Sequence, residues 1–300
     1  MISISKKYRD IALKMVESST HPKAIGKHNV FQPGNETNRQ LVDQIVRDVL
    51  LPGSRIEGFE YLQKLYELAE SGKSCLILME HYSNFDLPCF VYLANKQGEA
   101  GHEVTENLVA VAGMKLNVES EFVLAFAEAY SRIVIYPSRA LDAIEDSDQL
   151  ARERKTSNAI NRAALHEMVR QKHSGKLILV FPAGTRYRPG VESTKRGVRE
   201  IDSYIKSFHY MIMVGIAGNV LRISASEAMS DDLITEDVMV YRISPVIPCH
   251  DYRRHTRTSA SASSEKIAKQ HVADTVMSDL EKLHDEAEAL RVSELVHRQV

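Results

Sequence analysis

The 300-residue sequence predicts an α/β fold, with a mixed central sheet covered by helices and a small N-terminal helical subdomain. Two observations predict this class. From residue 74 onward, short apolar runs of strand length alternate with helical stretches. These runs are continuously apolar, which is typical of strands that are covered on both faces. An α/β domain is therefore predicted over residues 71–300.

The first 70 residues are predicted to form the helical subdomain. Apolar residues recur there at helical spacing in three segments, which are separated by Pro22, Pro33 and Pro52. The residues that carry this spacing include Tyr8, Ile11 and Met15, then Leu41, Ile45 and Val49, then Phe59, Leu62 and Leu65.

The α/β domain has six predicted strands and a clear long helix over residues 148–171. Residues 253–264 read as a polar linker without periodicity, and an amphipathic helix follows it. Packing on its own domain is the commonest fate of such a helix, so that is what we expect. The predicted strands are residues 75–79, 108–114, 132–137, 176–182, 211–217 and 238–244.

Composition excludes several classes of protein. The formal net charge is -2, so no global positive field favours nucleic acid. The three cysteines have no CxxC spacing and the first residues do not read as a secretory signal, which predicts a reduced, cytoplasmic protein. The longest apolar run, residues 210–221, is shorter than the roughly 18 residues that span a bilayer. Peripheral contact with a membrane stays open.

A histidine follows the first strand of the domain, in "LILMEHYSNFDLPCF" at residues 76–90. The run ends on Glu80 and His81, and Asp86 lies five positions after the histidine. A histidine at the carboxyl end of a strand, with a carboxylate close enough to orient it, is a typical general base of α/β enzymes. For a lone histidine, a surface position after a core strand would be the commoner reading.

Residues 179–190, "LVFPAGTRYRPG", carry the second candidate site. A strand leads into a loop with Gly184 and Thr185, and Arg186 and Arg188 follow. Glycine lets the backbone approach a ligand closely, and paired guanidinium groups suit a phosphate dianion. Taken alone, such an arginine pair is more often a solvated surface.

Two further basic residues extend this pattern. The strand at 132–137 is followed by Arg139, so three strands are predicted to deliver these side chains to one edge of the sheet, where ligands of α/β proteins gather. Lys195 extends the positive surface, although a structural salt bridge is an equally good role for it.

Together, the two stretches resemble the signatures of the glycerolipid acyltransferases. "HYSNFD" matches their H-x4-D motif, and "FPAGTRYR" is similar to their FPEGTRxR motif. The order of the two motifs and their separation of roughly a hundred residues also fit. The resemblance covers roughly residues 70–200.

Within this family, the chain looks closest to the soluble chloroplast-type glycerol-3-phosphate acyltransferases. Those enzymes tend to have a small residue where this chain has Ala183, and "RERKTSNAINRAALHEMV" at 152–169 is similar to their basic helix. Two departures stand against it. They carry a basic pair with a histidine where this chain has Arg139 and Ala140, and "TKRG" at 194–197 is closer to the acylglycerol-phosphate enzymes.

The resemblance implies a glycerol-3-phosphate 1-O-acyltransferase that makes lysophosphatidate, with acyl carrier protein or coenzyme A thioester as donor and with no cofactor or metal. His81 would be the general base and Asp86 would orient it. Arg186, Arg188 and Arg139 would hold the phosphate, with Gly184, Thr185 and Lys195 beside them. No covalent intermediate is needed, which agrees with the absence of a G-x-S-x-G motif. Candidates for an apolar acyl groove are Phe85, Leu87, Phe90 and Met114, although plain core positions are the commoner role for such residues.

Three alternatives remain at this level. The acceptor could instead be 1-acylglycerol 3-phosphate. A metal-dependent phosphohydrolase could use His81 and Asp86 as ligands, but it needs further acidic or histidine ligands where the sequence has arginines. A non-catalytic protein could bind anionic lipid headgroups in the same pocket.

Overall fold

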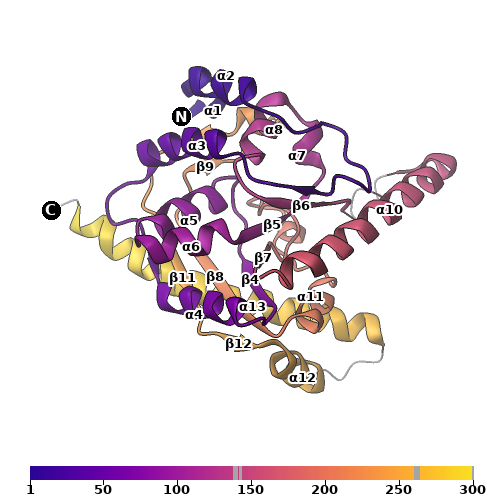
Figure 1. Cartoon of the computed structure of the whole chain (residues 1–300). Helices are drawn as coiled ribbons and strands as arrows, with labels where there is room; N and C mark the ends of the chain where they lie inside the picture. The colour runs from indigo at the N-terminus through magenta and orange to yellow at the C-terminus, as the bar shows by residue number, and fades with distance from the viewer. Residues whose placement is uncertain (138–140, 142–143, 227, 260–263, 299–300) are drawn as a thin grey trace.

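The computed structural model describes residues 1–137, 141, 144–226, 228–259 and 264–298 (Figure 1). The strands are β1 (Ile2–Ser3), β2 (Phe31–Gln32), β3 (Arg55–Glu57), β4 (Cys75–Met79), β5 (Leu108–Gly113), β6 (Arg132–Ile135), β7 (Leu177–Val180), β8 (Tyr210–Ala217), β9 (Leu221–Arg222), β10 (Leu233–Ile234), β11 (Val240–Ile243) and β12 (Ile247–Pro248). The α-helices are α1 (Ile4–Lys7), α2 (Arg9–Glu17), α3 (Glu36–Val49), α4 (Phe59–Glu70), α5 (Asp86–Asn95), α6 (Glu99–Glu106), α7 (Lys115–Val118), α8 (Glu121–Ala127), α10 (Ser147–Lys172), α11 (Ile201–Ser207), α12 (Cys249–Ser259) and α13 (Glu265–His297).

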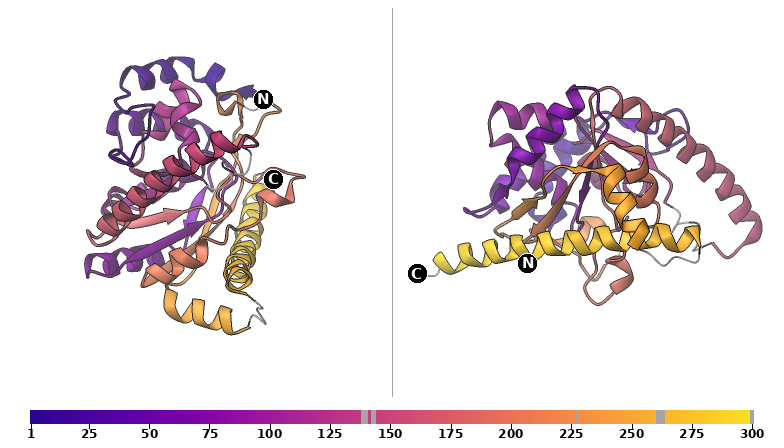
Figure 2. Two further views of the ribbon diagram at one scale, coloured as in Figure 1. Left: turned by 90° about the vertical axis from the view of Figure 1, so that its right-hand side faces the viewer. Right: turned by 90° about the horizontal axis from the view of Figure 1, so that it is seen from below.

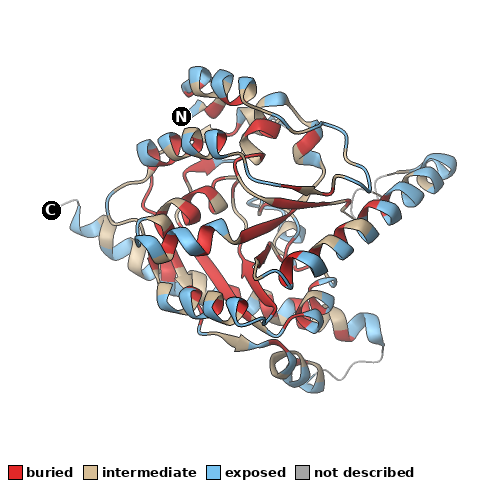
Figure 3. Cartoon of the chain, viewed as in Figure 1, coloured by how far each residue is buried: buried red, intermediate tan, exposed pale blue. Residues whose placement is uncertain are grey.

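A nine-stranded sheet forms the centre of the molecule, in the order β2-β6-β5-β7-β4-β8-β11-β3, with β12 also paired to β8. Strands β4 to β8 run parallel, whereas β2, β11 and β12 pair antiparallel to their neighbours β6 and β8. The central strands are buried along almost their whole length, as Figure 3 shows. The six predicted strands are therefore present, and the predicted mixed α/β sheet is confirmed.

Helices cover both faces of this sheet (Figure 2). Side chains of α3, α4, α5 and α8 form one core with Ile77 and Leu179 on one face. Side chains of α10, α11 and α13 form the other core with Leu78 and Val180. Neighbouring residues on one strand point to opposite faces, which is why a continuously apolar strand needs both layers.

The N-terminal 70 residues contain the expected helices and also three short strands. Strand β2 extends one end of the large sheet by pairing with β6, and β3 extends the other end by pairing with β11. Strands of two or three residues leave no readable period, so the sequence pattern did not predict them. The division into a subdomain at residue 70 stays a prediction.

The predicted polar linker at 253–264 is wrong for the part that the structure describes, because α12 extends to Ser259. This helix buries only Cys249 and Thr256, so it shows little apolar periodicity. Polar contacts hold it instead, with Arg253 donating to the buried Asp202 at 2.8 Å and the Tyr252 hydroxyl donating to Asp279 at 2.8 Å. Residues 260–263 lie outside the described residues.

The predicted C-terminal helix is present as α13, and it packs on its own chain as expected. It crosses the whole body in Figure 2 and buries Val272, Val276 and Leu280 against the sheet. In contrast, the first half of α10 projects away from the body (Figure 1) and is largely exposed in Figure 3. Within the described residues, we find no helix with the length and apolar character needed to cross a membrane.

Candidate active site

The two signature segments lie side by side because β4 and β7 are neighbouring parallel strands. Leu78 of β4 is in register with Val180 of β7, so the residues that follow both strands meet at the carboxyl edge of the sheet. The His81 ring stacks on Phe181, with ring centroids 4.0 Å apart and an interplanar angle of 20°. The Tyr187 amide donates to the His81 carbonyl oxygen at 2.8 Å, which joins the segments through their backbones as well.

His81 and Asp86 form a hydrogen-bonded pair. The imidazole Nδ1 lies 2.9 Å from Asp86 Oδ2, and the side chains are 16% and 1% exposed. A carboxylate at Nδ1 holds the proton on that nitrogen and leaves Nε2 as the free base. Since His81 also lines a large cavity, its free nitrogen is available to a ligand there.

The Asp86 carboxylate also shapes the loop that carries the histidine. Its Oδ2 accepts from the Tyr82 amide at 2.6 Å and from the Ser83 amide at 2.9 Å, and its Oδ1 accepts from the Ser83 hydroxyl at 3.0 Å. Asp86 stands at the start of α5, where a negative charge is favourable for the helix dipole. One buried carboxylate therefore fixes both the loop and the ring.

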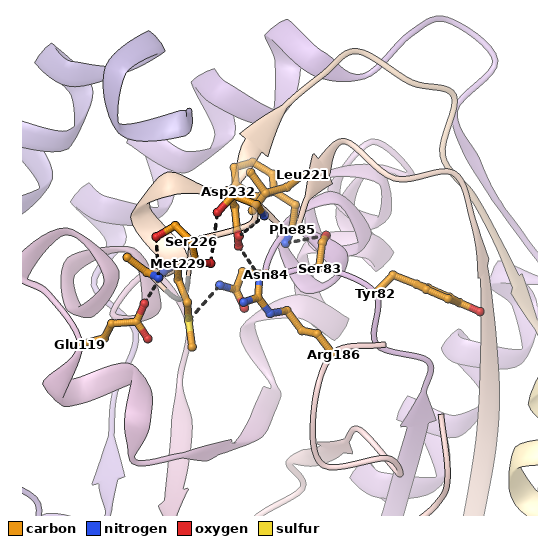
Figure 4. Close-up of polar contacts among 12 residues, drawn as sticks. Tyr82, Ser83, Asn84, Phe85, Glu119, Arg186, Leu221, Ser226, Met229 and Asp232 are labelled. Atoms are coloured by element: carbon orange, nitrogen blue, oxygen red, sulfur yellow. Dashed lines mark hydrogen bonds and ion pairs between the residues drawn. The ribbon is translucent and has the colours of Figure 1, made fainter. Parts of the chain in front are cut away.

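The arginine segment turns sharply after β7. Gly184 has a φ of 65°, a conformation that side chains disfavour, and its amide donates to the Phe181 carbonyl at 2.9 Å. This turn brings Thr185 and Arg186 to the cavity wall. Arg186 is buried and forms an ion pair with Asp232, which Figure 4 shows among its neighbours.

Two of the other predicted basic residues, Arg188 and Lys195, are not among the described residues of the cavity wall. Arg188 is exposed on the loop after Tyr187, and Lys195 donates to Glu281 of α13 at 2.7 Å. This hydrogen bond raises the pKa of Lys195. Arg139 lies outside the described residues. Strand β6, which precedes it, is separated from β7 by β5, so only two of the three predicted strands are direct neighbours.

A cavity of about 680 Å³ lies at the point where the connections of the sheet diverge. Strand β5 leads to β6 on one side, whereas β7 leads to β8 on the other side. Adjacent strands with such divergent connections open a crevice at their carboxyl ends, where α/β proteins bind ligands. The β5–β7 ladder here ends at Ala110 and Leu179, while β5 continues to Gly113. His81 lies beside this opening.

The cavity extends from this edge onto both faces of the sheet. Ala110 and Val111 are consecutive, belong to different cores and both line it. We call its part against α5 and α8 the inner branch, and its part against α10 and α11 the outer branch. The inner branch is lined by Leu87, Phe122, Val123, Phe126, Ala127 and Tyr130. The outer branch is lined by Asn161, Ala164, Leu165, Met168, Ile201, Ser203, Tyr204 and Ser207.

Of the four predicted groove residues, two face the cavity. Phe85 and Leu87 line it, whereas Phe90 and Met114 are not among the described residues of its wall. Phe90 is fully buried and packs against Tyr241, at 5.5 Å between ring centroids. Met114 packs at the edge of the core on the other face.

Sequence reasoning missed a polar cluster beside His81. The buried Glu80 accepts from the Tyr82 hydroxyl at 2.9 Å and from the Ile216 amide at 2.8 Å, and Nδ1 of His284 on α13 lies 3.4 Å from its Oε2. Glu80 raises the pKa of His284, and burial together with Glu80 raises that of Tyr82. In Figure 4, Tyr82 points away from the Arg186–Asp232 pair. No local pattern predicts His284, since its partner precedes it by some two hundred residues.

Asp232 was missed for the same reason, because it stands far from Arg186 in the sequence. It comes to the site on the segment after β9, in which Met229 contacts Asn84 at 3.4 Å through its sulfur (Figure 4). The Asp232 carboxylate also accepts from the Ser224 amide at 3.2 Å. Among the residues that the structure describes, no group of three histidine, cysteine or acidic side chains is arranged to hold a metal ion.

Comparison with known proteins bears on this site. No curated protein matches the chain. A family model described as Acyltransferase matches residues 54–216, which is more than half of the sequence and includes both signature segments. The paired His81 and Asp86, the cavity and this match agree, and the chain belongs to the acyltransferase family.

Proposed function

We propose that this acyltransferase moves a fatty acyl group from an acyl thioester to a hydroxyl of glycerol 3-phosphate and so makes lysophosphatidate. The observation that carries the proposal is that His81, which is paired with Asp86, lines one cavity together with Thr185 and Arg186. A base thus faces a candidate phosphate contact in one cavity.

His81 would act as the general base through Nε2. It would take the proton of the glycerol hydroxyl as the oxygen attacks the thioester carbonyl, and the carbon–sulfur bond would then break. The imidazolium could return its proton to the departing thiolate. Asp86 would stabilise the imidazolium through its 2.9 Å bond to Nδ1. The stacked Phe181 would keep the ring in place.

Arg186 would contact the phosphate of the acceptor. Its ion pair with Asp232 uses part of its hydrogen-bonding capacity, and a guanidinium carries five N–H donors. A guanidinium that is already held in place loses less entropy on binding than a free one. Thr185 offers a hydroxyl beside it. Arg188 and Lys195 stay proposed contributors to the positive field rather than residues of the described cavity wall. Arg139, which lies outside the described residues, stays a proposed phosphate contact.

The apolar cavity would hold the hydrocarbon chain of the donor. Its volume, about 680 Å³, lies in the range of typical ligand pockets, roughly 300 to 1,000 Å³. Burying each methylene group of a chain contributes about 0.8 kcal/mol, so a long acyl chain is a strong anchor.

The test is thiol release from purified protein with an acyl thioester and either glycerol 3-phosphate or 1-acylglycerol 3-phosphate. We expect release that requires glycerol 3-phosphate and falls by about 100- to 10,000-fold in His81→Ala. The exposed His173 gives a matched control, because His173→Ala should retain activity. Release only with the 1-acyl acceptor would contradict the proposed substrate, and folded protein without release from either acceptor would contradict catalysis of this kind.

A further inference from the structure

The cavity that His81 lines reaches both faces of the sheet, and its two branches differ in their lining. In the inner branch, all six defining side chains are buried or half-buried, and five of them are pure hydrocarbon. In the outer branch, four of the eight residues are exposed, so this branch opens to solvent between α10 and α11. A closed apolar branch and an open mixed branch thus belong to the one cavity that His81 lines.

The reaction that we propose needs two such passages, and this inference rests on that proposed function. The reactive carbon of an acyl thioester lies within a linear molecule. A hydrocarbon chain leaves it on one side, and on the other side the sulfur leads to a pantetheine arm with two amides. If this carbon is to lie beside His81, the two halves of the donor must leave in different directions.

We propose that the donor spans the carboxyl edge of the sheet between β5 and β7, with its acyl chain in the inner branch and its pantetheine arm in the outer branch. The closed branch suits the half of the donor that ends in a methyl group. The open branch suits the half that continues to a carrier, because the carrier needs access from solvent.

The lining of the outer branch supports this direction. Ser203 and Ser207 stand four residues apart on one face of α11, and the Ser207 hydroxyl donates to the Tyr204 carbonyl oxygen at 3.0 Å. Burial raises the pKa of Tyr204 to about 12, so its hydroxyl stays protonated and can donate to an amide carbonyl. Asn161 lies on α10, and its side chain is already hydrogen-bonded to the amide and carbonyl of Tyr136, at 2.8 and 3.0 Å. The hydroxyls of Ser203 and Tyr204 match the amides of pantetheine and would be poorly used by a hydrocarbon chain.

Direct binding tests the proposal without turnover. We would measure the Kd of coenzyme A, butyryl-CoA, palmitoyl-CoA and palmitate in the absence of any acceptor. Ser203→Phe places a large ring in the outer branch, and Ala127→Phe places one in the inner branch. Lys206→Phe is the matched control, since Lys206 is exposed on the same helix and is not part of the described cavity wall.

Ser203→Phe should weaken coenzyme A and both of its thioesters about tenfold or more, while palmitate stays within about twofold. Ala127→Phe should weaken palmitate and palmitoyl-CoA and leave coenzyme A and butyryl-CoA unchanged. If Ala127→Phe does not fold, Phe126→Trp fills the same branch with a smaller change. Lys206→Phe should bind every probe as the parent protein does.

Three results would overturn the inference. If Ser203→Phe weakens palmitate and Ala127→Phe weakens coenzyme A, the acyl chain lies in the outer branch. If both variants weaken only palmitate, both branches are hydrocarbon sites. If neither variant changes the binding of any probe, the donor occupies neither branch. The Kd of phosphopantetheine alone distinguishes recognition of the pantetheine arm from recognition of the nucleotide. Ser203→Phe should weaken its binding if the arm is what the outer branch recognises. Selective binding without thiol release to any acceptor would refute the proposed function and leave this inference standing.

Discussion

Replacing Asp86 with asparagine separates the two roles of this carboxylate. The amide oxygen of the introduced side chain can take the place of Oδ2, where it still accepts from His81 and from the amides of Tyr82 and Ser83. The new NH₂ group takes the place of Oδ1 and can donate to the Ser83 hydroxyl, which lies 3.0 Å away. Asp86→Asn therefore keeps the loop and removes only the negative charge.

The expected loss follows from that charge. A hydrogen bond to a charged group is worth about 1.5 to 3 kcal/mol, and tenfold in rate corresponds to about 1.4 kcal/mol. The negative charge stabilises the imidazolium, which forms only as the proton is transferred. The value of kcat should therefore fall roughly 10- to 150-fold, with little change in KM. Asp86→Ala should lose more activity and also stability, since the buried Ser83 amide loses its acceptor at a cost of about 1 to 3 kcal/mol and the part-buried Tyr82 amide loses the same acceptor.

The assay is thiol release under saturating substrates, together with urea denaturation of the parent protein and both variants. Asp86→Asn with activity within about twofold of the parent would refute a role for the charge. A stability of Asp86→Asn as low as that of Asp86→Ala would refute the claim that the amide preserves the loop.

Three further predictions concern the surroundings of the site. Because Glu80 raises the pKa of His284, the attraction between them is fully present below a pH of about 6.5 and is lost as the pH rises through the raised pKa. The free energy of unfolding of His284→Gln, measured by urea titration, should therefore differ from that of the parent protein more at pH 6 than at pH 9. An equal difference at the two pH values would contradict this. Arg186→Met leaves a buried carboxylate without its partner and should cost about 3 to 5 kcal/mol of stability, whereas a loss below about 1 kcal/mol by denaturation would show that the pair is not buried in solution. Burial raises the pKa of Cys75 and Cys249 to about 12, so the three thiols should react with a disulfide reagent at pH 8 only after unfolding, and fast reaction of the native protein would refute their burial.

The features that the sequence predicted correctly are those that depend on residues close together in the chain. Continuous apolar runs predicted β4 and β7, and a short spacing on one loop predicted that His81 and Asp86 meet. The strands β2 and β3 have too few residues to show a period, and α12 depends on ion pairs such as that of Arg253 with Asp202. These features arise from contacts between distant segments, which no window of sequence contains.

The same limit applies to the site. The motif placed Arg186 near the cavity, but the sequence offered no sign that Asp232 would hold it. Conversely, Arg188 shares the motif and stands exposed on the same loop, outside the cavity wall. A motif therefore predicts which segment approaches a ligand better than it predicts which of its side chains does so.

Helix α13 shows how far the site depends on residues beyond the family match, which ends at residue 216. It holds the segment of His81 through the contact of His284 with Glu80, and it holds the arginine segment through the bond of Glu281 to Lys195. Gly215 on β8 makes this approach feasible, since a Cβ there would lie 2.5 Å from the His284 amide nitrogen. A side chain at this position would push the helix outward and loosen both signature segments at once. The geometry of the candidate active site thus depends partly on the absence of a side chain at Gly215 of β8, which is a constraint that neither signature motif contains.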